Sequence, residues 1–163
     1  MYFDNVDEMN EKMIVNWNNT VGLNDIVYHL GDFGDYDFLK YLNGNIILLE
    51  GNYERDKISI PTPKQKEKLC DYVTALSLKS HEHNLTMVHE PSHIRNIEGF
   101  YLFGHIHEKQ KVKNNGWISN QNKSFGLNVG VDCHNFTPVS IETIKFYREA
   151  IENIYDEECF VNF

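Results

Sequence analysis

Short apolar runs that each stop at a polar residue recur along this chain, and this pattern constrains its fold more than any other feature. The runs have the length and the β-branched content of buried strands, and they lie at 25–30, 45–50, 85–89, 100–103 and 127–131. Helical spacing of apolar residues appears at 5–19, and Ser140 can cap a second helix that continues to about residue 153. Strands interleaved with helices predict one domain over residues 1–163, of the α/β or mixed α+β class, with a central sheet.

The remaining segments are connectors. We expect helical turns at 36–42, a charged connector at 54–69 with a short helix after Pro63, and a surface loop or exposed hairpin at 108–125. Two apolar runs at 71–80 and 85–89 flank a polar turn, and this arrangement predicts a β-hairpin.

Composition excludes several classes of protein. Lys and Arg number 15 against 24 Asp and Glu, for a formal charge of −9, so a nucleic acid is an unlikely partner except as a phosphodiester substrate. The three cysteines are odd in number and form no C-x-x-C pair, which argues against a disulfide framework and a Cys-ligated zinc site. The chain shows neither a signal peptide nor a run of the roughly 20 apolar residues that span a membrane. We therefore expect a cytoplasmic protein without membrane contacts.

Five polar side chains follow the strand-like runs and are typical metal ligands. In chain order they are Asp32, Asn52, His89, His105 and His107. Ligands of α/β folds gather at the carboxyl ends of strands, so these side chains are expected to converge. A carboxylate, an amide oxygen and imidazoles suit Mn²⁺, Zn²⁺, Fe²⁺ or Ni²⁺. Two such ions could activate water and hold the oxygens of a phosphoryl group.

Each of these residues also has an ordinary structural interpretation. Asp32 and Asn52 both follow a glycine, as turn residues do, and His89 could simply end a strand. The case for a metal site rests on all five occurring in this order and setting. His93 could touch a substrate or be a loop residue, and His81 lies in a polar turn where exposure to solvent is expected.

Four stretches resemble the motif series of calcineurin-like metallophosphoesterases. They are Asp25-Ile-Val-Tyr-His-Leu-Gly-Asp32, Leu49-Glu-Gly-Asn52, Val88-His89 and Phe103-Gly-His-Ile-His107. The stretches 128–132 and 138–142 look like the small phage and bacterial branch of that family. The resemblance runs from about residue 6 to residue 145.

This resemblance implies a fold and an activity. The fold would be a four-layer αββα sandwich with a di-metal centre at one end of two packed sheets. The activity would be hydrolysis of a small phosphomonoester or phosphodiester substrate by metal-bound hydroxide. Mn²⁺ is the leading candidate metal, with one or two ions per chain.

The resemblance also implies roles for particular residues. Asp32 would bridge the two metals, and His107 would be a ligand of the first. Asn52, His89 and His105 would complete the second metal's protein ligands. Asn52 and Tyr53 would be the catalytic groups, and His93 is a candidate substrate contact.

Two departures from the family pattern qualify these expectations. The family's first motif, an Asp-x-His after the first core strand, is absent, and the chain begins where the segment after that motif would begin. The family motif Gly-Asn-His-[Asp/Glu] reads Gly51-Asn52-Tyr53-Glu54 here. A phenol can donate a hydrogen bond, but its ordinary pKa of about 10 makes it a poor proton shuttle near neutral pH. We expect a complete second metal site, a weak first one, and impaired activity or occupancy by one metal.

Several alternatives stay open at this stage. A catalytically degenerate phosphoesterase-fold protein that acts as a binding or scaffold module is the second interpretation of the function. A missing core strand would leave an exposed sheet edge. The edge could be covered by homodimerisation or by another segment of the chain, or the natural protein could be longer, with its reading frame opened here at an internal Met.

Overall fold

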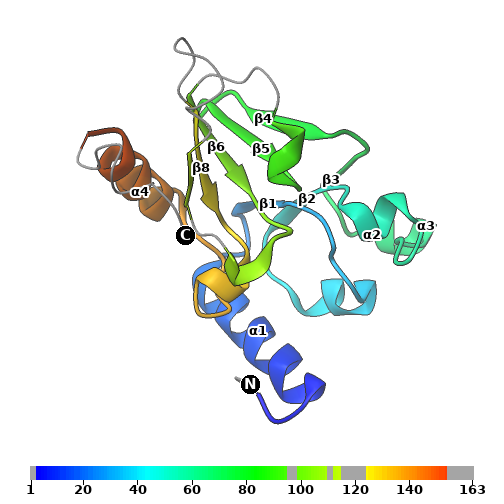
Figure 1. Cartoon of the computed structure of the whole chain (residues 1–163). Helices are drawn as coiled ribbons and strands as arrows, with labels where there is room; N and C mark the ends of the chain where they lie inside the picture. Colours follow the sequence, from blue (N-terminus) through cyan, green and yellow to red (C-terminus); the bar gives the residue numbers. More distant parts are fainter. Residues whose placement is uncertain (1–2, 95–98, 110–111, 115–123, 154–163) are drawn as a thin grey trace.

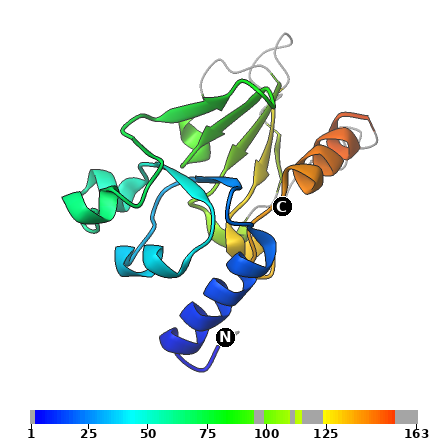
Figure 2. The ribbon, with the colours of Figure 1, turned by 180° about the vertical axis from the view of Figure 1, so that it is seen from behind.

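The computed structural model describes residues 3–94, 99–109, 112–114 and 124–153. Figure 1 shows strands at the centre, with helix α4 on one side and the short helices α2 and α3 on the other. Helix α1 extends below the strands, and the view from behind shows the same arrangement (Figure 2). The chain is therefore a mixed α/β protein, as the alternation of patterns predicted, but it is built on two sheets and not on one central sheet.

The first sheet has three parallel strands in the order β1-β2-β3. They are β1 (Ile26–His29), β2 (Asn45–Leu49) and β3 (Asp71–Val73). Tyr28 lies opposite Ile47, and Leu49 lies opposite Val73. Within the described residues β1 is an edge strand of this sheet.

The second sheet has five strands in the order β4-β5-β6-β8-β7. They are β4 (Ser77–Ser80), β5 (Leu85–Val88), β6 (Gly99–Phe103), β7 (Val112–Asn114) and β8 (Ser124–Asn128). The pairs β5–β6 and β6–β8 are parallel, whereas β4–β5 and β7–β8 are antiparallel.

Two expected strands have different bounds in the structure. The run 71–80 is split, because Asp71–Val73 pairs with β2 and only Ser77–Ser80 forms the hairpin with β5. The interior strand β2 has backbone groups to satisfy on both edges, which explains why it recruits β3. The run 127–131 ends as a strand at Asn128, whose side-chain oxygen accepts from the backbone N–H of Gly130 and turns the chain.

The largest core lies where the two sheets and α4 meet. Leu30 directly follows β1, Leu49 ends β2, and α4 (Ile141–Asn153) supplies Ile144 and Ile151. The second sheet contributes Leu85, Met87, Phe100, Leu102 and Leu127. Burial of these side chains is the main force that holds the sheets together.

Each sheet also packs on its outer face. Ile46 and Leu48 of β2 contact Tyr36 and Leu39 of the 3₁₀ helix η1 (Tyr36–Tyr41). On the second sheet, Val88, Tyr101 and Phe103 form a smaller cluster with Ile94 and Ile106. Helical turns were expected at 36–42, and they are of the 3₁₀ type.

The two long helices lie where they were predicted. Helix α1 (Val6–Thr20) begins after Asn5, whose side chain accepts from the N–H of Glu8 at 2.8 Å. It has no fully buried residue, and Trp17 anchors it by donating to the carbonyl of Asn43 at 2.9 Å. Helix α4 begins after Ser140, whose hydroxyl accepts from the N–H of Thr143.

Short helical turns connect the strands. They are α2 (Asn52–Arg55), α3 (Pro63–Lys66), η2 (Pro91–His93), η3 (His107–Lys109) and η4 (Val131–Cys133). The predicted connector at 54–69 thus holds α3 after Pro63, as expected, but α2 already begins at Asn52. The expected surface segment at 108–125 includes β7 and the start of β8, which pair antiparallel, and its Asn115-Gly116 turn lies outside the described residues. Among the residues that the structure describes, no helix is both long and apolar enough to cross a membrane.

Candidate metal centre

Four of the five predicted ligands converge beyond the carboxyl ends of four strands. Asp32 follows β1, Asn52 opens α2 after β2, His89 follows β5, and His105 follows β6. One donor atom from each of Asp32, His89 and His105 lies within 4.8 Å of the other two. The convergence predicted from strand ends is therefore observed for these residues.

The donor atoms of this cluster are close together. Nε2 of His89 lies 2.8 Å from Oδ1 of Asn52, 3.1 Å from Nδ1 of His105 and 3.4 Å from Oδ2 of Asp32. Nδ1 of His105 lies 3.0 Å from the same Asn52 oxygen. An ion about 2.1 Å from each ligand would place neighbouring ligands roughly 3.0 to 3.4 Å apart in octahedral or tetrahedral geometry. The observed separations fit such an ion.

The hydrogen-bonding capacity of the cluster also indicates a site for a cation. Nδ1 of His89 lies 2.7 Å from the carbonyl oxygen of Leu30, and a carbonyl only accepts, so this nitrogen carries the ring proton. Nε2 of a neutral His89 then has a bare lone pair, which faces the oxygens of Asn52 and Asp32. Only Nδ1 of His105 could bring a hydrogen into this group of four acceptors.

Protonating His89 would relieve this clash of lone pairs, but its surroundings oppose it. His89 is 2 % exposed, and burial lowers its pKa below the ordinary value. The backbone of Leu30 and the charge of Asp32 work in the opposite direction, and the net shift of the pKa is still downward. A cluster rich in acceptors and poor in protons is what a cation stabilises.

Three of the predicted ligands have a left-handed backbone. Asp32, His105 and His107 adopt positive φ angles of 54°, 67° and 51°, as do four other described non-glycine residues, Lys57, Asn84, Asn135 and Phe136. This left-handed conformation is unfavourable for residues with a Cβ, and such strain is typical of functional sites.

Two glycines allow the loops that carry Asp32 and Asn52 to touch. A Cβ on Gly31 would overlap the backbone of Gly51, and one on Gly51 would overlap Asp32. Gly31 also has a φ of +99°. Any larger side chain at these positions would separate Asp32 from Asn52.

Glu54 connects the loops that carry Asp32 and Asn52, and the sequence analysis did not predict it as a site residue. It is 2 % exposed, and Oε2 accepts from the N–H groups of Asp32 and Gly51, each at 2.8 Å. Oε1 accepts from the N–H of Phe33 and the hydroxyl of Tyr36. Burial acts to raise the pKa of Glu54, but these hydrogen bonds outweigh it and the pKa is lowered. Its place two residues after Asn52 in the motif was the available signal.

His29 lies behind the cluster and is not one of the grouped donors. Its Nδ1 accepts from the N–H of Gly31 at 3.3 Å, and its ring packs 4.9 Å from that of Phe33. Burial lowers the pKa of His29 from 6.5 to about 4, with a smaller contribution from His89, while Glu54 and Asp32 act to raise it. The ring therefore stays neutral in the folded protein near neutral pH.

His107 is the predicted ligand that lies outside the cluster. Its side chain is 77 % exposed, and Nδ1 lies 2.8 Å from Oδ2 of Asp132. Asn128, fully buried at the end of β8, donates to the backbone carbonyl of His107 at 2.6 Å. Asp132 had been noticed only as part of the stretch 128–132, and its contact with His107 was missed.

Tyr53 and His93 are placed near the cluster along the chain. The side chain of Tyr53 is 45 % exposed, and its N–H donates to Oδ1 of Asp32 at 2.9 Å. Nε2 of His93 lies 3.7 Å from a Glu90 oxygen, and its buried Nδ1 has no hydrogen-bond partner among the described residues.

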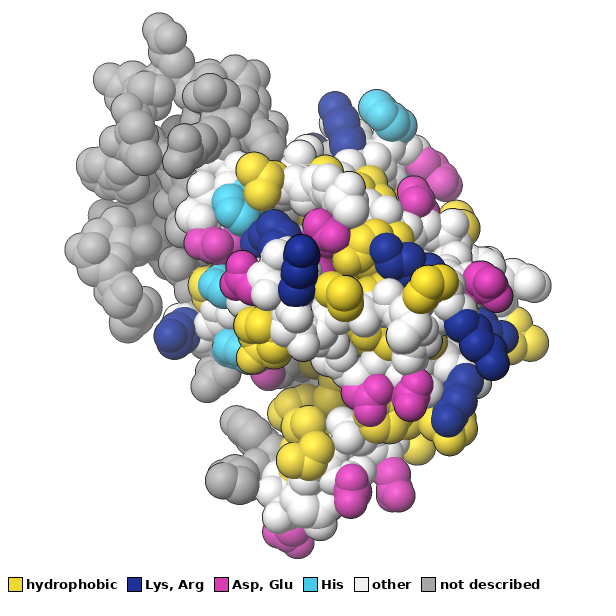
Figure 3. Space-filling view, turned by 90° about the vertical axis from the view of Figure 1, so that its right-hand side faces the viewer, with side chains coloured by type: hydrophobic (Ala, Val, Ile, Leu, Met, Phe, Trp, Pro, Cys, Tyr) yellow, Lys and Arg dark blue, Asp and Glu magenta, His cyan; other side chains and the backbone are white. Residues whose placement is uncertain are grey.

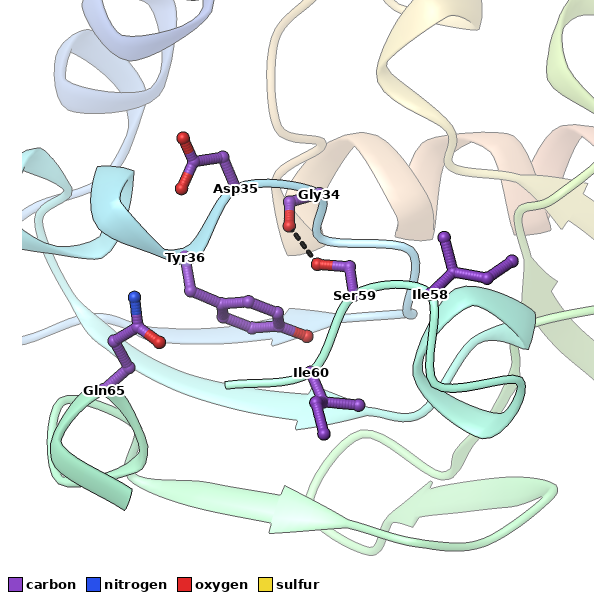
Figure 4. A pocket seen from close by; sticks show the side chains of 7 residues that line it. All are labelled: Gly34, Asp35, Tyr36, Ile58, Ser59, Ile60 and Gln65. Carbon is purple, nitrogen blue, oxygen red and sulfur yellow. Dashed lines mark hydrogen bonds between the residues drawn. The ribbon is translucent and has the colours of Figure 1, made fainter. Parts of the chain in front are cut away.

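An open hollow of about 480 Å³ lies beside the Asp32 and Tyr53 loops, and none of the four clustered residues lines it. In Figure 4 the Tyr36 ring extends across the hollow, and the Ser59 hydroxyl donates to the carbonyl of Gly34. Figure 3 looks onto the side that carries α2 and α3, and it shows histidine and acidic side chains along one margin of this face. The hollow is lined by Gly34, Asp35, Tyr36, Ile58, Ser59, Ile60 and Gln65.

Fold and cluster together define a two-sheet α/β protein with an Asp, Asn and His group fit for a divalent cation. The chain is 32 % identical over 152 residues to the uncharacterized protein MJ1445 of Methanocaldococcus jannaschii, and the match covers 87 % of this chain and 76 % of that protein. The chain belongs to the family of that protein. No protein-family model matches the chain, and no solved structure matches it.

Proposed function

We propose that this protein is a divalent-metal-dependent phosphoesterase of the calcineurin-like type, acting on a small phosphomonoester or phosphodiester. The proposal rests on the motif series of the sequence and on the convergence of Asp32, Asn52, His89 and His105. The two-sheet α/β architecture is compatible with a four-layer αββα sandwich. The edge position of β1 is compatible with the absence of a first core strand.

The observation that carries the proposal is the surplus of acceptors around Nε2 of His89. Its Nδ1 proton is engaged by the Leu30 carbonyl, so Nε2 faces the oxygens of Asn52 and Asp32 with a lone pair. A divalent cation would satisfy these lone pairs together. The mixed nitrogen and oxygen donors accept several divalent metals. The family resemblance favours Mn²⁺, with Zn²⁺, Fe²⁺ or Ni²⁺ as alternatives.

When bound, such a cation acts as a Lewis acid that lowers the pKa of water and neutralises charge on a phosphoryl group. Asn52, His89 and His105 would hold it with Asp32. Tyr53, exposed beside Asp32, would donate a hydrogen bond to a phosphoryl oxygen. With a tyrosine in place of the family's histidine, protonation of the leaving group falls to water, so substrates with good leaving groups should react best.

Hydrolysis of an aryl phosphodiester in the presence of Mn²⁺ tests this proposal. We expect turnover by the wild-type chain and a loss of at least about 100-fold in the His105→Ala variant, as when a positioned catalytic group is removed. His81→Ala is the matched control, because His81 is exposed in the β4–β5 turn. Equal turnover in wild type and His105→Ala would reject the proposal.

A scaffold function is the second candidate, and the position of His107 favours it. His107 pairs with Asp132 outside the cluster, so its contribution to a first metal site is not assembled with the other ligands. Metal analysis by mass spectrometry after loading with Mn²⁺ or Zn²⁺ separates the two functions. Retained metal supports the phosphoesterase, and metal-free protein supports a binding module.

The edge strand β1 raises a separate point about assembly. We propose that a second copy of the chain covers this edge, because an unpaired strand edge is a template for β pairing. Sedimentation at several protein concentrations would test it, and a monomer throughout would reject it.

A further inference from the structure

We propose that Asp132 is a positioning residue that fixes His107 with its proton on Nδ1 and so reserves Nε2 for a metal ion. The inference rests on the proposed function and deepens it, since it concerns the one predicted ligand that lies outside the cluster. It also assigns a role to the loop that follows β8, which the motif series leaves unexplained.

The contact between the two side chains dictates the tautomer. Nδ1 of His107 lies 2.8 Å from Oδ2 of Asp132. A carboxylate only accepts hydrogen bonds, so the His107 ring donates from Nδ1. In the neutral ring Nε2 then carries a free lone pair, which is the form of imidazole that binds a metal.

Inside the cluster, His89 is held in the same tautomer by an acceptor on its Nδ1. Its Nδ1 donates to the Leu30 carbonyl at 2.7 Å, and its Nε2 faces Asn52 at 2.8 Å. At His89, a hydrogen-bond acceptor on Nδ1 thus leaves Nε2 as the atom that can bind a metal. Metal-binding histidines generally have such a partner on the other ring nitrogen, often a carboxylate.

The loop after β8 is built to hold this pair. Oδ1 of Asp132 accepts from the N–H of Cys133 at 3.1 Å, which fixes the carboxylate and leaves Oδ2 for His107. The buried Asn128 donates to the His107 carbonyl, and the Cys133 thiol lies 3.4 Å from the same oxygen. Backbone and ring of His107 are thus held from one loop, even though its side chain is 77 % exposed.

An ordinary surface hydrogen bond is the competing explanation. Exposed pairs of this kind contribute little to stability and need no function. The fixed geometry of the pair argues against it, because the Cys133 N–H holds the Asp132 carboxylate and the buried Asn128 holds the His107 carbonyl.

The Asp132→Asn variant provides a sharp test, because Cys133 decides how the amide is oriented. The Cys133 N–H holds an oxygen at the Oδ1 position, so the amide NH₂ takes the position of Oδ2. That NH₂ would donate to Nδ1 of His107 and move the ring proton to Nε2, where it blocks a metal.

The tautomer can be read in the metal-free protein by NMR of ¹⁵N-labelled histidine rings. The measurement belongs at about pH 8, above the ordinary histidine pKa of about 6.5. We expect His107 protonated on Nδ1 in the wild type and on Nε2 in Asp132→Asn, with backbone amide spectra otherwise alike. Asp7→Asn on α1 is the charge-matched control and should leave His107 unchanged. An Nε2–H tautomer in the wild type, or no change in Asp132→Asn, would overturn the proposal.

A Zn²⁺ titration of the same ring signals tests the link to the metal. We expect Asp132→Asn to lower the Zn²⁺ affinity read from the His107 ring by about 10- to 100-fold. In a His107→Ala background, where the Zn²⁺ affinity is read from the remaining histidine rings, Asp132→Asn should lower it no further. An equal loss of affinity in that background would mean that Asp132 acts directly on the ion, and no response of His107 in the wild type would mean that it binds none. Either result overturns the positioning role. The proposed phosphoesterase fails separately, if His89 and His105 do not respond to Zn²⁺.

Discussion

The hydroxyl of Tyr36 donates a 2.7 Å hydrogen bond to Oε1 of Glu54, inside the protein and directly behind the Asp32 loop. Glu54 also accepts the N–H groups of Asp32, Phe33 and Gly51. One buried carboxylate thus ties together the two loops that carry Asp32 and Asn52. Its hydrogen bonds set the positions of these candidate ligands.

Replacing Glu54 with Gln should destabilise the protein by about 3 kcal/mol, because the new NH₂ group must face backbone N–H donors. Placed at Oε2 it would meet Asp32 and Gly51, and placed at Oε1 it would meet Phe33. Chemical denaturation measures the loss. Glu67→Gln, on the exposed end of α3, is the control and should change stability little; similar values for the two variants would contradict the role of Glu54.

Gly31→Ala should destabilise the protein more than Gly34→Ala. Both glycines have positive φ, +99° and +84°, so both alanines strain the backbone. A Cβ at Gly31 would in addition overlap Gly51, whereas a Cβ at Gly34 meets nothing within 4 Å. We expect roughly 1 kcal/mol for Gly34→Ala and several times that for Gly31→Ala. Thermal unfolding of both variants gives the comparison, and equal losses would refute the close contact of the two loops.

His105→Gly should be more stable than His105→Ala by about 1 kcal/mol, although both lack the imidazole. The φ angle of His105 is +67°, which glycine adopts without strain and alanine does not. Both variants should lose metal affinity alike. If alanine proves the more stable, the strained conformation at this position is wrong.

Stability should fall as the pH drops from 6.5 towards 4, partly because of His29. Burial lowers the pKa of His29 to about 4, so between these values the unfolded chain binds a proton that the folded chain does not. The loss is complete once the pH passes below the folded pKa. His29→Asn keeps an acceptor for the Gly31 N–H and cannot titrate, so its stability should depend less on pH in this window.

Denaturation in the presence of a chelator measures this slope without interference from metal. His81→Asn, in the exposed β4–β5 turn, should keep the wild-type slope. A steeper slope in His29→Asn than in the wild type would reverse the predicted sign. The charges nearest His29 are Glu54, Asp32 and His89, and the first two act to hold its proton.

Much of the candidate site followed from local pattern. Asp32, Asn52, His89 and His105 each end an apolar run, and strand ends meet at one edge of a sheet. The helices at 6–20 and 141–153 were likewise visible in the spacing and the caps of the sequence.

Long-range choices were not visible in the sequence. The run 71–80 reads as one strand, yet its first residues pair with β2 because that strand needed a second neighbour. Asp132 meets His107 across 25 residues of chain, and Glu54 gathers N–H groups from the Asp32 loop. Such partners depend on how the two sheets are placed, and no local spacing encodes that.

The origin of the clustered ligands has a mechanical consequence. Asp32 and Asn52 extend from the three-stranded sheet, whereas His89 and His105 extend from the five-stranded sheet. An ion held by all four would cross-link the two sheets, in addition to the apolar contacts between them. Removal of the metal should then loosen the interface between the sheets first, so that hydrogen exchange accelerates at β1 and β6 before the rest of the protein responds.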